Sequence, residues 1–148
     1  MIVLLDTDVL IDVALGRVPF VDNASSLLDA IEQGGARGFV AWHSISNFYY
    51  LVAASGSRTD ARRFIDEITQ FLDVAPATRD HLRRALRFPL KDFEDAMQVG
   101  AATACSADFI VTRNIRDFRQ SPIPALTPAQ ALAQMRWRSS SRSRLLPE

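Results

Sequence analysis

The sequence contains a single cysteine, Cys105, among 148 residues, which excludes an internal disulfide framework and a cysteine-based zinc cluster. It has no apolar run of the roughly 20 residues that a membrane-spanning helix needs. It also has no net charge, because 17 basic residues balance 17 acidic ones, so charge alone gives no argument for binding to nucleic acid or a membrane. Lysine is almost missing. Lys91 is the only one, so any phosphate-binding surface would depend on arginine.

The remaining composition is typical of an ordinary globular domain. Hydrophobic residues make up 48% of the chain and charged residues 23%, which excludes a disordered or fibrous protein. The apolar run Ile2–Leu5 has no basic region before it and is ended at once by Asp6, so we interpret it as a core strand and not a signal peptide. We therefore expect a reduced, cytoplasmic protein with no membrane partner. We expect one domain over residues 1–137 and a flexible Ser/Arg-rich tail over residues 138–148.

Short apolar runs alternate along the chain with amphipathic segments. The runs indicate strands at 2–5, 38–41, 74–75, 108–112 and 124–126. The amphipathic segments indicate helices at 9–14, 24–33, 44–54, 59–72, 78–88, 92–105 and 128–137. This order predicts a three-layer α/β/α domain with a central, mainly parallel sheet. The carboxyl ends of parallel strands meet at one edge of the sheet, where functional sites form.

Polar residues stand at the places in this fold where strands end or a helix begins. They are Asp6, Asp8, Asp92, Asp95, Asn114 and Asp117. Carboxylates brought within about 6 Å of each other repel, so at least one pKa rises unless a cation neutralises them. Mg²⁺ prefers such oxygen ligands, and a bound ion can orient a water for attack on a phosphodiester. The pattern therefore favours a metal-assisted hydrolase.

Most of these residues also have a purely structural explanation. Asp92 and Asp95 stand where a helix dipole favours acids, and Asn114 and Asp117 can build a turn. Asp6 is different, because an acid that terminates a buried strand needs a partner.

Several other residues are interpreted as parts of the scaffold. We expect His43 to be a packed or hydrogen-bonding residue, Asp12 to be solvated or capping, and Cys105 to be a small core residue. The aromatic residues expected in the core are Trp42, Tyr49 and Tyr50.

Three segments resemble the motifs of PIN domains, in the order that this family has them. They are IVLLDTDVLID at Ile2–Asp12, DFEDA at Asp92–Ala96 and IVTRNIRDF at Ile110–Phe118. The resemblance extends from Met1 to about Ala133. It implies a ribonuclease that depends on Mg²⁺ or Mn²⁺ and that is often the toxin of a bacterial toxin–antitoxin pair. The implied partners are RNA and an antitoxin protein.

The resemblance also implies roles for particular residues. Asp6, Asp95 and Asp117 match the acids that hold the metal ion and carry out catalysis, and Asp92 is a further ligand or a helix cap. Asn114 is an alternative to Asp117 or its helper. Contacts with the RNA substrate are expected from Thr112, Arg113, Asn114 and Arg116.

One position departs from the family pattern. The family usually has a glutamate in the helix after the second strand, and the matching stretch Ser44–Tyr50 offers Asn47. Asparagine can hydrogen-bond a water or ligate through its carbonyl, but it supplies no negative charge and cannot act as a base. We therefore expect Asp92 or Asp8 to compensate, and a lower metal affinity or a reduced activity.

Three functions fit these residues. The first is a PIN-type ribonuclease, and the second is a degenerate PIN domain that binds RNA or a protein without cutting, which Asn47 favours. The third is a phosphohydrolase of the haloacid-dehalogenase type, because Asp6-Thr7-Asp8 resembles its nucleophile motif. The short chain, Leu10 and the position of Lys91 depart from that third pattern, and we favour the ribonuclease.

Members of the family often form dimers, and we expect a homodimer here. The surfaces considered for it are the apolar faces of the helices at 24–33 and 59–72, and Trp137.

Overall fold

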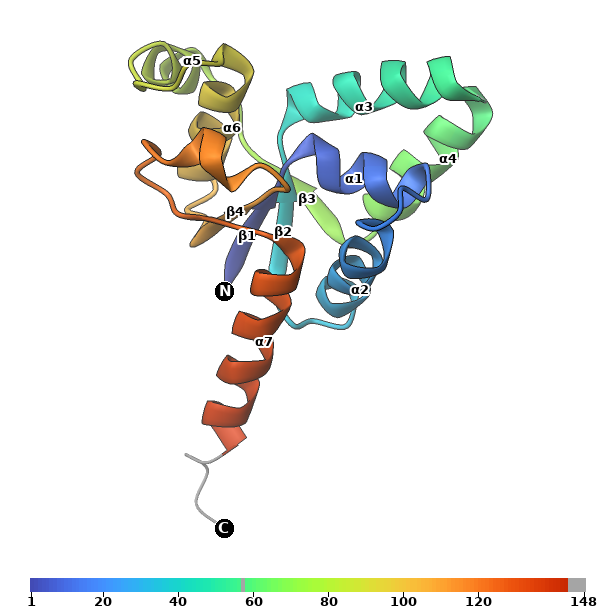
Figure 1. The fold of residues 1–148 in the computed structure, drawn as a ribbon. Coiled ribbons are helices and arrows are strands. Elements are labelled where there is room, and N and C mark those ends of the chain that lie inside the picture. The colour runs from blue at the N-terminus through green and yellow to red at the C-terminus, as the bar shows by residue number, and fades with distance from the viewer. Residues whose placement is uncertain (57, 144–148) are drawn as a thin grey trace.

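The protein folds around a five-stranded sheet in which every strand pairing is parallel (Figure 1). The structure is a computed structural model that describes residues 1–56 and 58–143. The strands are β1 (Ile2–Leu5), β2 (Arg37–Val40), β3 (Leu72–Val74), β4 (Phe109–Val111) and β5 (Ala125–Leu126). Their order across the sheet is β3-β2-β1-β4-β5, so β1 lies in the middle with β4 beside it. The predicted α/β fold with a parallel sheet is confirmed.

Helices cover both faces of the sheet and complete the three layers. Those on one face are α1 (Thr7–Ala14), α2 (Val21–Glu32), α3 (Trp42–Ser55), α4 (Arg58–Ile68) and α7 (Pro128–Ser143). The other face is covered by α6 (Phe93–Ala104), with α5 (Arg79–Ala85) packed on α6. A short 3₁₀ helix, η1 (Ile115–Phe118), follows β4.

The position of β1, covered on both faces of the sheet, explains why its apolar run is continuous. Val3 and Leu5 point into the core beneath α1, α2 and α3, whereas Leu4 points to the opposite face and packs with Val99 of α6. All of these side chains are fully buried. Successive residues of a strand face opposite sides of a sheet, so a strand covered on both sides must be apolar throughout.

Helix α2 ends at the predicted place. Gly34 has a φ of +85°, a left-handed conformation that glycine adopts without strain. The amide of Gly34 donates to the carbonyl of Ile31, and the amide of Gly35 donates to that of Ala30. These two bonds form a Schellman motif, which satisfies the last carbonyls of the helix.

Several helix boundaries differ from the prediction. Helix α4 ends at Ile68 and not at Leu72, which is the first residue of β3, and α5 ends at Ala85 and not at Phe88. Helix α3 begins at Trp42 and not at a Ser44 cap, because Ser44 is buried and its hydroxyl accepts a hydrogen bond from Gln98. Helix α7 continues beyond Trp137 to Ser143, so part of the predicted tail is helical. Serine hydroxyls at 139–141 donate to carbonyls of the preceding turn, so these side chains are hydrogen-bonded within the helix itself. Residues 144–148 of the predicted tail lie outside the described residues.

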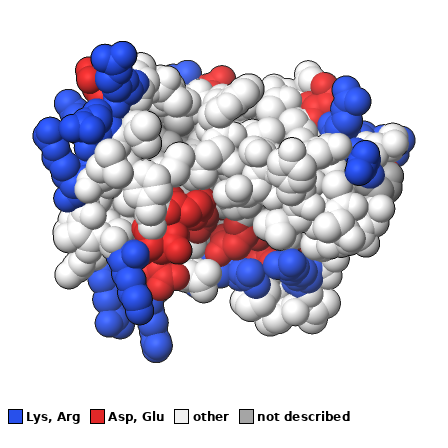
Figure 2. Space-filling model, turned by 90° about the horizontal axis from the view of Figure 1, so that it is seen from above, with Lys and Arg blue, Asp and Glu red and all other residues white. Residues whose placement is uncertain are grey.

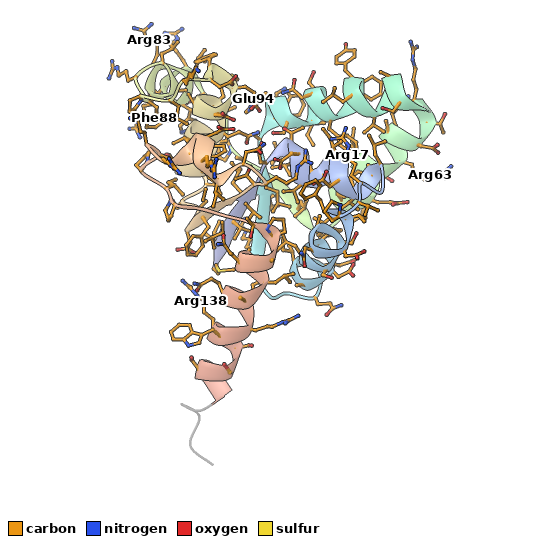
Figure 3. The ribbon with its side chains drawn as sticks, viewed as in Figure 1. Arg17, Arg63, Arg83, Phe88, Glu94 and Arg138 are labelled. Carbon is orange, nitrogen blue, oxygen red and sulfur yellow. The ribbon has the colours of Figure 1, made fainter. Side chains whose placement is uncertain are left out.

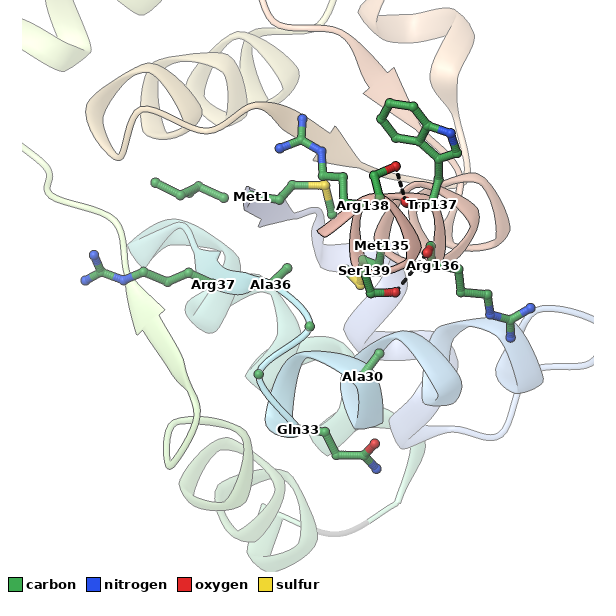
Figure 4. A pocket seen from close by; sticks show the side chains of 14 residues that line it. Met1, Ala30, Gln33, Ala36, Arg37, Met135, Arg136, Trp137, Arg138 and Ser139 are labelled. Carbon is green, nitrogen blue, oxygen red and sulfur yellow. Dashed lines mark hydrogen bonds between the residues drawn. The ribbon is translucent and has the colours of Figure 1, made fainter. Parts of the chain in front are cut away.

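The surfaces considered for a dimer differ in accessibility. The apolar faces of α2 and α4 are buried in the core of the chain itself, so they are not available to a second copy. Trp137 is exposed and lines a hollow of about 880 Å³ between α7, α2 and β1 (Figure 4). Arg37, Arg136 and Arg138 also line it, and none of its described lining residues is acidic. Among the described helices, none is long and apolar enough to cross a membrane.

Candidate metal centre

A second hollow, of about 650 Å³, lies at the edge of the sheet where the strands have their carboxyl ends. Figure 2, which looks onto this edge, shows acidic side chains gathered near its middle with basic side chains around them. We call it the acidic hollow. Its polar lining residues are Asp6, Thr7, Asp8, Arg17, Asn47, Tyr50, Asp92, Glu94, Asp95, Arg113, Asn114 and Asp117. Four separate elements and the loops between them therefore contribute to one site.

Asp6 is positioned by the two central strands. Its backbone amide donates to the carbonyl of Val111 at 2.9 Å, which extends the pairing of β1 and β4 by one residue. The carboxylate accepts from the backbone amide of Thr7 and from the hydroxyl of Thr112, both at 2.8 Å. Asp6 is 7% exposed and Thr112 is fully buried. The acid is thus fixed at the floor of the hollow before any ligand is bound.

Asp8 faces the loop that follows β4. Its Oδ2 accepts from the Arg113 amide at 3.1 Å, from the Thr112 hydroxyl at 3.3 Å and from the Asn114 side-chain amide at 3.4 Å. Asp8 therefore holds this loop in place through Oδ2, and its buried Oδ1 has no hydrogen-bond partner among the described residues.

The N-terminus of α6 brings three more carboxylates to the hollow. Asp92 is the N-cap, and its side chain accepts from the amides of Glu94 and Asp95. Asp92, Glu94 and Asp95 each offer a carboxylate oxygen, and these oxygens lie within 4.8 Å of one another. Helix capping explains Asp92, but it does not explain why Glu94 and Asp95 are directed toward each other.

Burial, together with the crowding of carboxylates, raises two pKa values far above their ordinary range. Burial, followed by the nearby charge of Asp8, raises the pKa of Asp6 to about 8. Burial, followed by the charges of Glu94, Asp92 and Asp117, raises the pKa of Asp95 to about 7. The ionised forms of Asp6 and Asp95 are therefore disfavoured unless a cation lies beside them.

The structure places the other predicted site residues at different depths. Asp117, Asn114 and Asn47 are exposed and line the acidic hollow. Thr112 lies behind Asp6 and is fully buried, so it orients that carboxylate and does not reach a substrate. Arg116 lines a separate hollow with Phe118 and Arg119.

Arg113 is partly buried and is paired with two acids of α1. Its Nε lies 3.2 Å from Oδ2 of Asp12 and 3.7 Å from Oδ2 of Asp8, and its guanidinium sits 4.4 Å from the ring centre of Phe20. Asp12 is 1% exposed, so the prediction that it is solvated or capping is wrong. A buried carboxylate needs a cation, and Arg113 supplies it.

The expectations for the remaining scaffold residues have mixed outcomes. His43 does form a hydrogen bond, since its Nε2 lies 3.0 Å from Oε1 of Glu94, and Cys105 is buried in the core. Trp42 and Tyr50 were expected in the core, but they are 69% and 71% exposed. Tyr50 lines the acidic hollow, and Trp42 lines a smaller hollow with His81 and Ala75.

Two charged residues of the hollow, Glu94 and Arg17, were not among the predicted site residues. Glu94 stands inside the motif Asp92–Ala96, and its spacing of four from Gln98 was the available signal. Arg17 follows α1 and is exposed at the rim of the hollow. Its position in a loop gave no signal, because the path of that loop depends on tertiary packing.

The donor set fits a divalent cation with oxygen ligands. The negatively charged side chains of the hollow are Asp and Glu, and none of its described lining residues is cysteine or histidine. The hollow is also open to solvent, so a bound ion would keep some of its water ligands. The raised pKa values of Asp6 and Asp95 mark groups whose ionised form a cation would stabilise. Asp6, Asp95 and Asp117 offer such ligands, with Asp92 beside them.

Comparison with known proteins agrees with this architecture. A family model described as the PIN domain matches residues 2–116, and the chain therefore belongs to the PIN domain family. A comparison with curated proteins finds no match.

Three solved structures illustrate the shared fold. VapBC2 from Rickettsia felis, bound to a promoter DNA fragment, has a TM-score of 0.69 at 15% identity, over 86% of this chain and 98% of that one. FitAcB from Neisseria gonorrhoeae has a TM-score of 0.60 at 13% identity, over 86% and 98%. VapC20 from Mycobacterium tuberculosis, a toxin that cleaves the sarcin–ricin loop, has a TM-score of 0.60 at 12% identity, over 73% and 86%.

Membership of the PIN domain family argues against the phosphohydrolase alternative. That alternative needs Asp8 as a mobile acid and base, whereas Asp8 is engaged by Thr112, Arg113 and Asn114. The two alternatives that remain are both PIN domains, one that cuts RNA and one that only binds.

Proposed function

We propose that this protein is a ribonuclease that hydrolyses RNA phosphodiesters with the help of Mg²⁺ or Mn²⁺. The observation that supports it best is the convergence of Asp6, Asp95 and Asp117 on one open hollow, with two of the three carboxyl pKa values raised by burial and by neighbouring carboxylates. A functional cluster is a better explanation of such an arrangement than a structural one, because the fold gains no stability from it.

Residues at different depths of the hollow would have different roles. Asp6 and Asp95 would hold the ion, Asp117 would complete the set or orient a water, and Asp92 would keep the first turn of α6 in place. When bound, the ion would supply positive charge to the phosphate and activate a water for attack. Thr112 would keep Asp6 in its orientation, and Asn47 would hydrogen-bond a water or the substrate.

Arg17 is the arginine best placed to contact a phosphate of the RNA. It is exposed at the rim of the acidic hollow, whereas Arg113 is paired with Asp12 and Arg116 lines another hollow. We therefore transfer the predicted phosphate contact from Arg113 and Arg116 to Arg17. Asn114 keeps its place at the rim.

The test is cleavage of a mixed RNA pool by the wild-type protein, Asp6→Asn and Asp95→Asn, with Mg²⁺ or Mn²⁺ and with EDTA. The matched control is Asp29→Asn, which removes an exposed carboxylate on α2. Cleavage that needs the ion, is lost in the first two variants and survives in the control would support the proposal. A folded wild-type protein that cleaves nothing with either ion would refute it.

A role as a toxin with a protein antitoxin follows from the same reasoning. The similar structures include toxin–antitoxin complexes, and the fold of this chain covers nearly the whole of those partner-binding toxins. Expression of the protein in a bacterial host should then arrest growth, and Asp6→Asn should not. Normal growth of cells that contain soluble wild-type protein would contradict the toxin role, and the in vitro cleavage assay would still test the nuclease.

A binding module is the second candidate, and Asn47 is the observation that favours it. It predicts RNA binding that needs no divalent ion and that is unchanged by Asp6→Asn. Electrophoretic mobility shifts in EDTA, measured on the same variants, separate this function from cleavage.

A further inference from the structure

The acidic hollow has an uncharged residue at the position where the family usually has its second acid. Asn47 lies on α3 and lines the hollow, and its amide gives no negative charge to a divalent ion. If the site holds such an ion, as the proposed function requires, a carboxylate from another element has to supply that charge. Glu94 is the carboxylate that reaches from α6 toward α3.

The side chain of Glu94 is directed into the space between α6 and α3 (Figure 3). Its Oε1 lies 3.0 Å from Nε2 of His43, in the first turn of α3. An ionised carboxylate only accepts hydrogen bonds, so His43 donates through Nε2. Glu94 thus spans the gap between the helix that carries Asp95 and the helix that carries Asn47.

A second contact fixes the same oxygen from within α6. Gln98, one helical turn further on, donates from Nε2 to Oε1 of Glu94 at 3.0 Å. The Gln98 amide also lies 2.7 Å from the Ser44 hydroxyl and 3.4 Å from that of Thr7. Thr7 adjoins Asp6, so one buried amide connects the end of β1, the start of α3 and Glu94. Neither Gln98 nor His43 occupies Oε2 of Glu94.

The fold incurs a cost to keep Gln98 at this position. Gln98 is fully buried, and its Oε1 has no hydrogen-bond partner among the described residues. A buried polar atom without a partner is unfavourable, and an apolar residue would pack here without that penalty. A polar residue kept at such a position is explained if its task is to orient Glu94.

We propose that Glu94 supplies the metal-holding carboxylate that Asn47 does not, and that Gln98 and His43 are positioning residues that hold Glu94 for this purpose. Oxygens of Glu94 and Asp95 already lie within 4.8 Å of each other, which lets one ion contact both. In this arrangement, the negative charge that the family usually has on α3 comes from Glu94 on α6, within the same hollow.

Calorimetric titration of Mn²⁺ into the full chain tests the first part without any need for activity. Glu94→Gln keeps the size of the side chain and removes its charge, and we expect the Kd for Mn²⁺ to rise by about tenfold or more. Glu67→Gln makes the same change at an exposed position on α4 and should leave the Kd unchanged. Equal Kd values for Glu94→Gln and wild type, or an equal rise in Glu67→Gln, would overturn the proposal.

A rescue variant makes the exchange of positions testable. Adding Asn47→Glu to Glu94→Gln places a carboxylate where the family pattern has it, and we expect the Mn²⁺ affinity to recover. No recovery in a variant whose circular dichroism and metal-free melting temperature match those of Glu94→Gln would count against the exchange.

A double-mutant cycle tests the positioning role. Gln98→Leu should raise the Kd for Mn²⁺ when Glu94 is present and should have no further effect in the Glu94→Gln background. General damage to the fold would weaken binding equally in both backgrounds, and such additivity would overturn the role of Gln98.

Asp6→Asn separates this inference from the proposed function. If the wild-type protein binds no Mn²⁺, or if Asp6→Asn binds it as tightly as wild type, the proposed metal site itself fails. If Asp6→Asn abolishes binding and Glu94→Gln does not weaken it, only the role of Glu94 fails.

Discussion

The hydroxyl of Thr112 donates a hydrogen bond to Oδ2 of Asp6 at 2.8 Å, which joins the ends of two adjacent parallel strands. The two residues lie far apart in the sequence and meet because β1 and β4 are neighbours in the sheet. The acid at the floor of the hollow is therefore oriented by the sheet and not by a flexible loop.

Replacing Thr112 tests this arrangement. Thr112→Val keeps the shape of the side chain but removes the donor to Asp6 and Asp8, and it should lower the free energy of unfolding by about 1–3 kcal/mol. It should also weaken Mn²⁺ binding, because Asp6 loses its fixed orientation. Thr112→Ser keeps the hydroxyl and should retain most of the stability and most of the Mn²⁺ affinity. Chemical denaturation measures the first and calorimetry the second. A Val variant that behaves like the Ser variant would contradict the role of the hydroxyl.

The raised pKa of Asp6 predicts how stability depends on pH. In the folded protein this carboxyl binds its proton up to about pH 8, whereas its ordinary value is 3.8. Between these limits the folded state binds more protons than the unfolded state, so stability falls as pH rises, by at most about 1.4 kcal/mol per pH unit for one group. Asp6→Asn should flatten this decline in denaturation curves recorded in EDTA. Parallel curves for the two proteins would show that Asp6 does not titrate in this window.

Addition of a divalent ion should oppose this loss of stability at higher pH. The ion binds the ionised carboxylates, so its binding releases protons and becomes tighter as pH rises. Melting temperatures measured with excess Mn²⁺ should therefore rise above the metal-free values by more at pH 8 than at pH 6. An increase that is independent of pH would mean that Mn²⁺ binds elsewhere on the protein.

The pair formed by Arg113 and Asp12 predicts a strong loss of stability when one partner is removed. Arg113→Met leaves the buried Asp12 carboxylate without its cation, which typically costs about 3–5 kcal/mol. Asp12→Asn added to this variant removes the unpaired charge and should restore part of the loss. Guanidinium denaturation of both single variants and the double variant measures the coupling. Strict additivity would show that the two side chains act independently.

The exposed Arg17 predicts a change in salt dependence. Arg17→Ala should weaken RNA binding and reduce the slope of log K against log salt by about 1, because one phosphate contact is lost. Arg63→Ala removes an exposed arginine of α4, which Figure 3 shows far from Glu94, and should leave the slope unchanged. Equal slopes in all three proteins would exclude Arg17 as a phosphate contact.

The fold could be predicted from the sequence because its signals are local. The continuous apolar run at Ile2–Leu5 indicates a strand covered on both sides, and Asp6 marks the edge where parallel strands end. Gly34 ends a helix because glycine adopts its left-handed conformation without strain. Each of these inferences needs only the neighbours of a residue in the sequence.

The residues that prediction missed depend on partners from distant segments. Asp12 resembles any polar helix residue until Arg113 is brought to it by the loop after β4. Trp42 and Tyr50 resemble core residues, but the face of α3 that carries them is turned to solvent. The role of Glu94 can be recognised only in the folded structure, where His43 of α3 lies opposite it.

The distribution of charge gives the acidic hollow two unlike walls. The carboxylates come from the N-termini of α1 and α6 and from the segment after β4, whereas the wall formed by the middle of α3 offers only Asn47, Tyr50 and Leu51. An entering molecule meets a strongly polar surface on one side and a neutral, aromatic surface on the other. A ligand with one charged and one flat apolar part can satisfy both walls in a single orientation, so the cavity imposes a direction on whatever it binds.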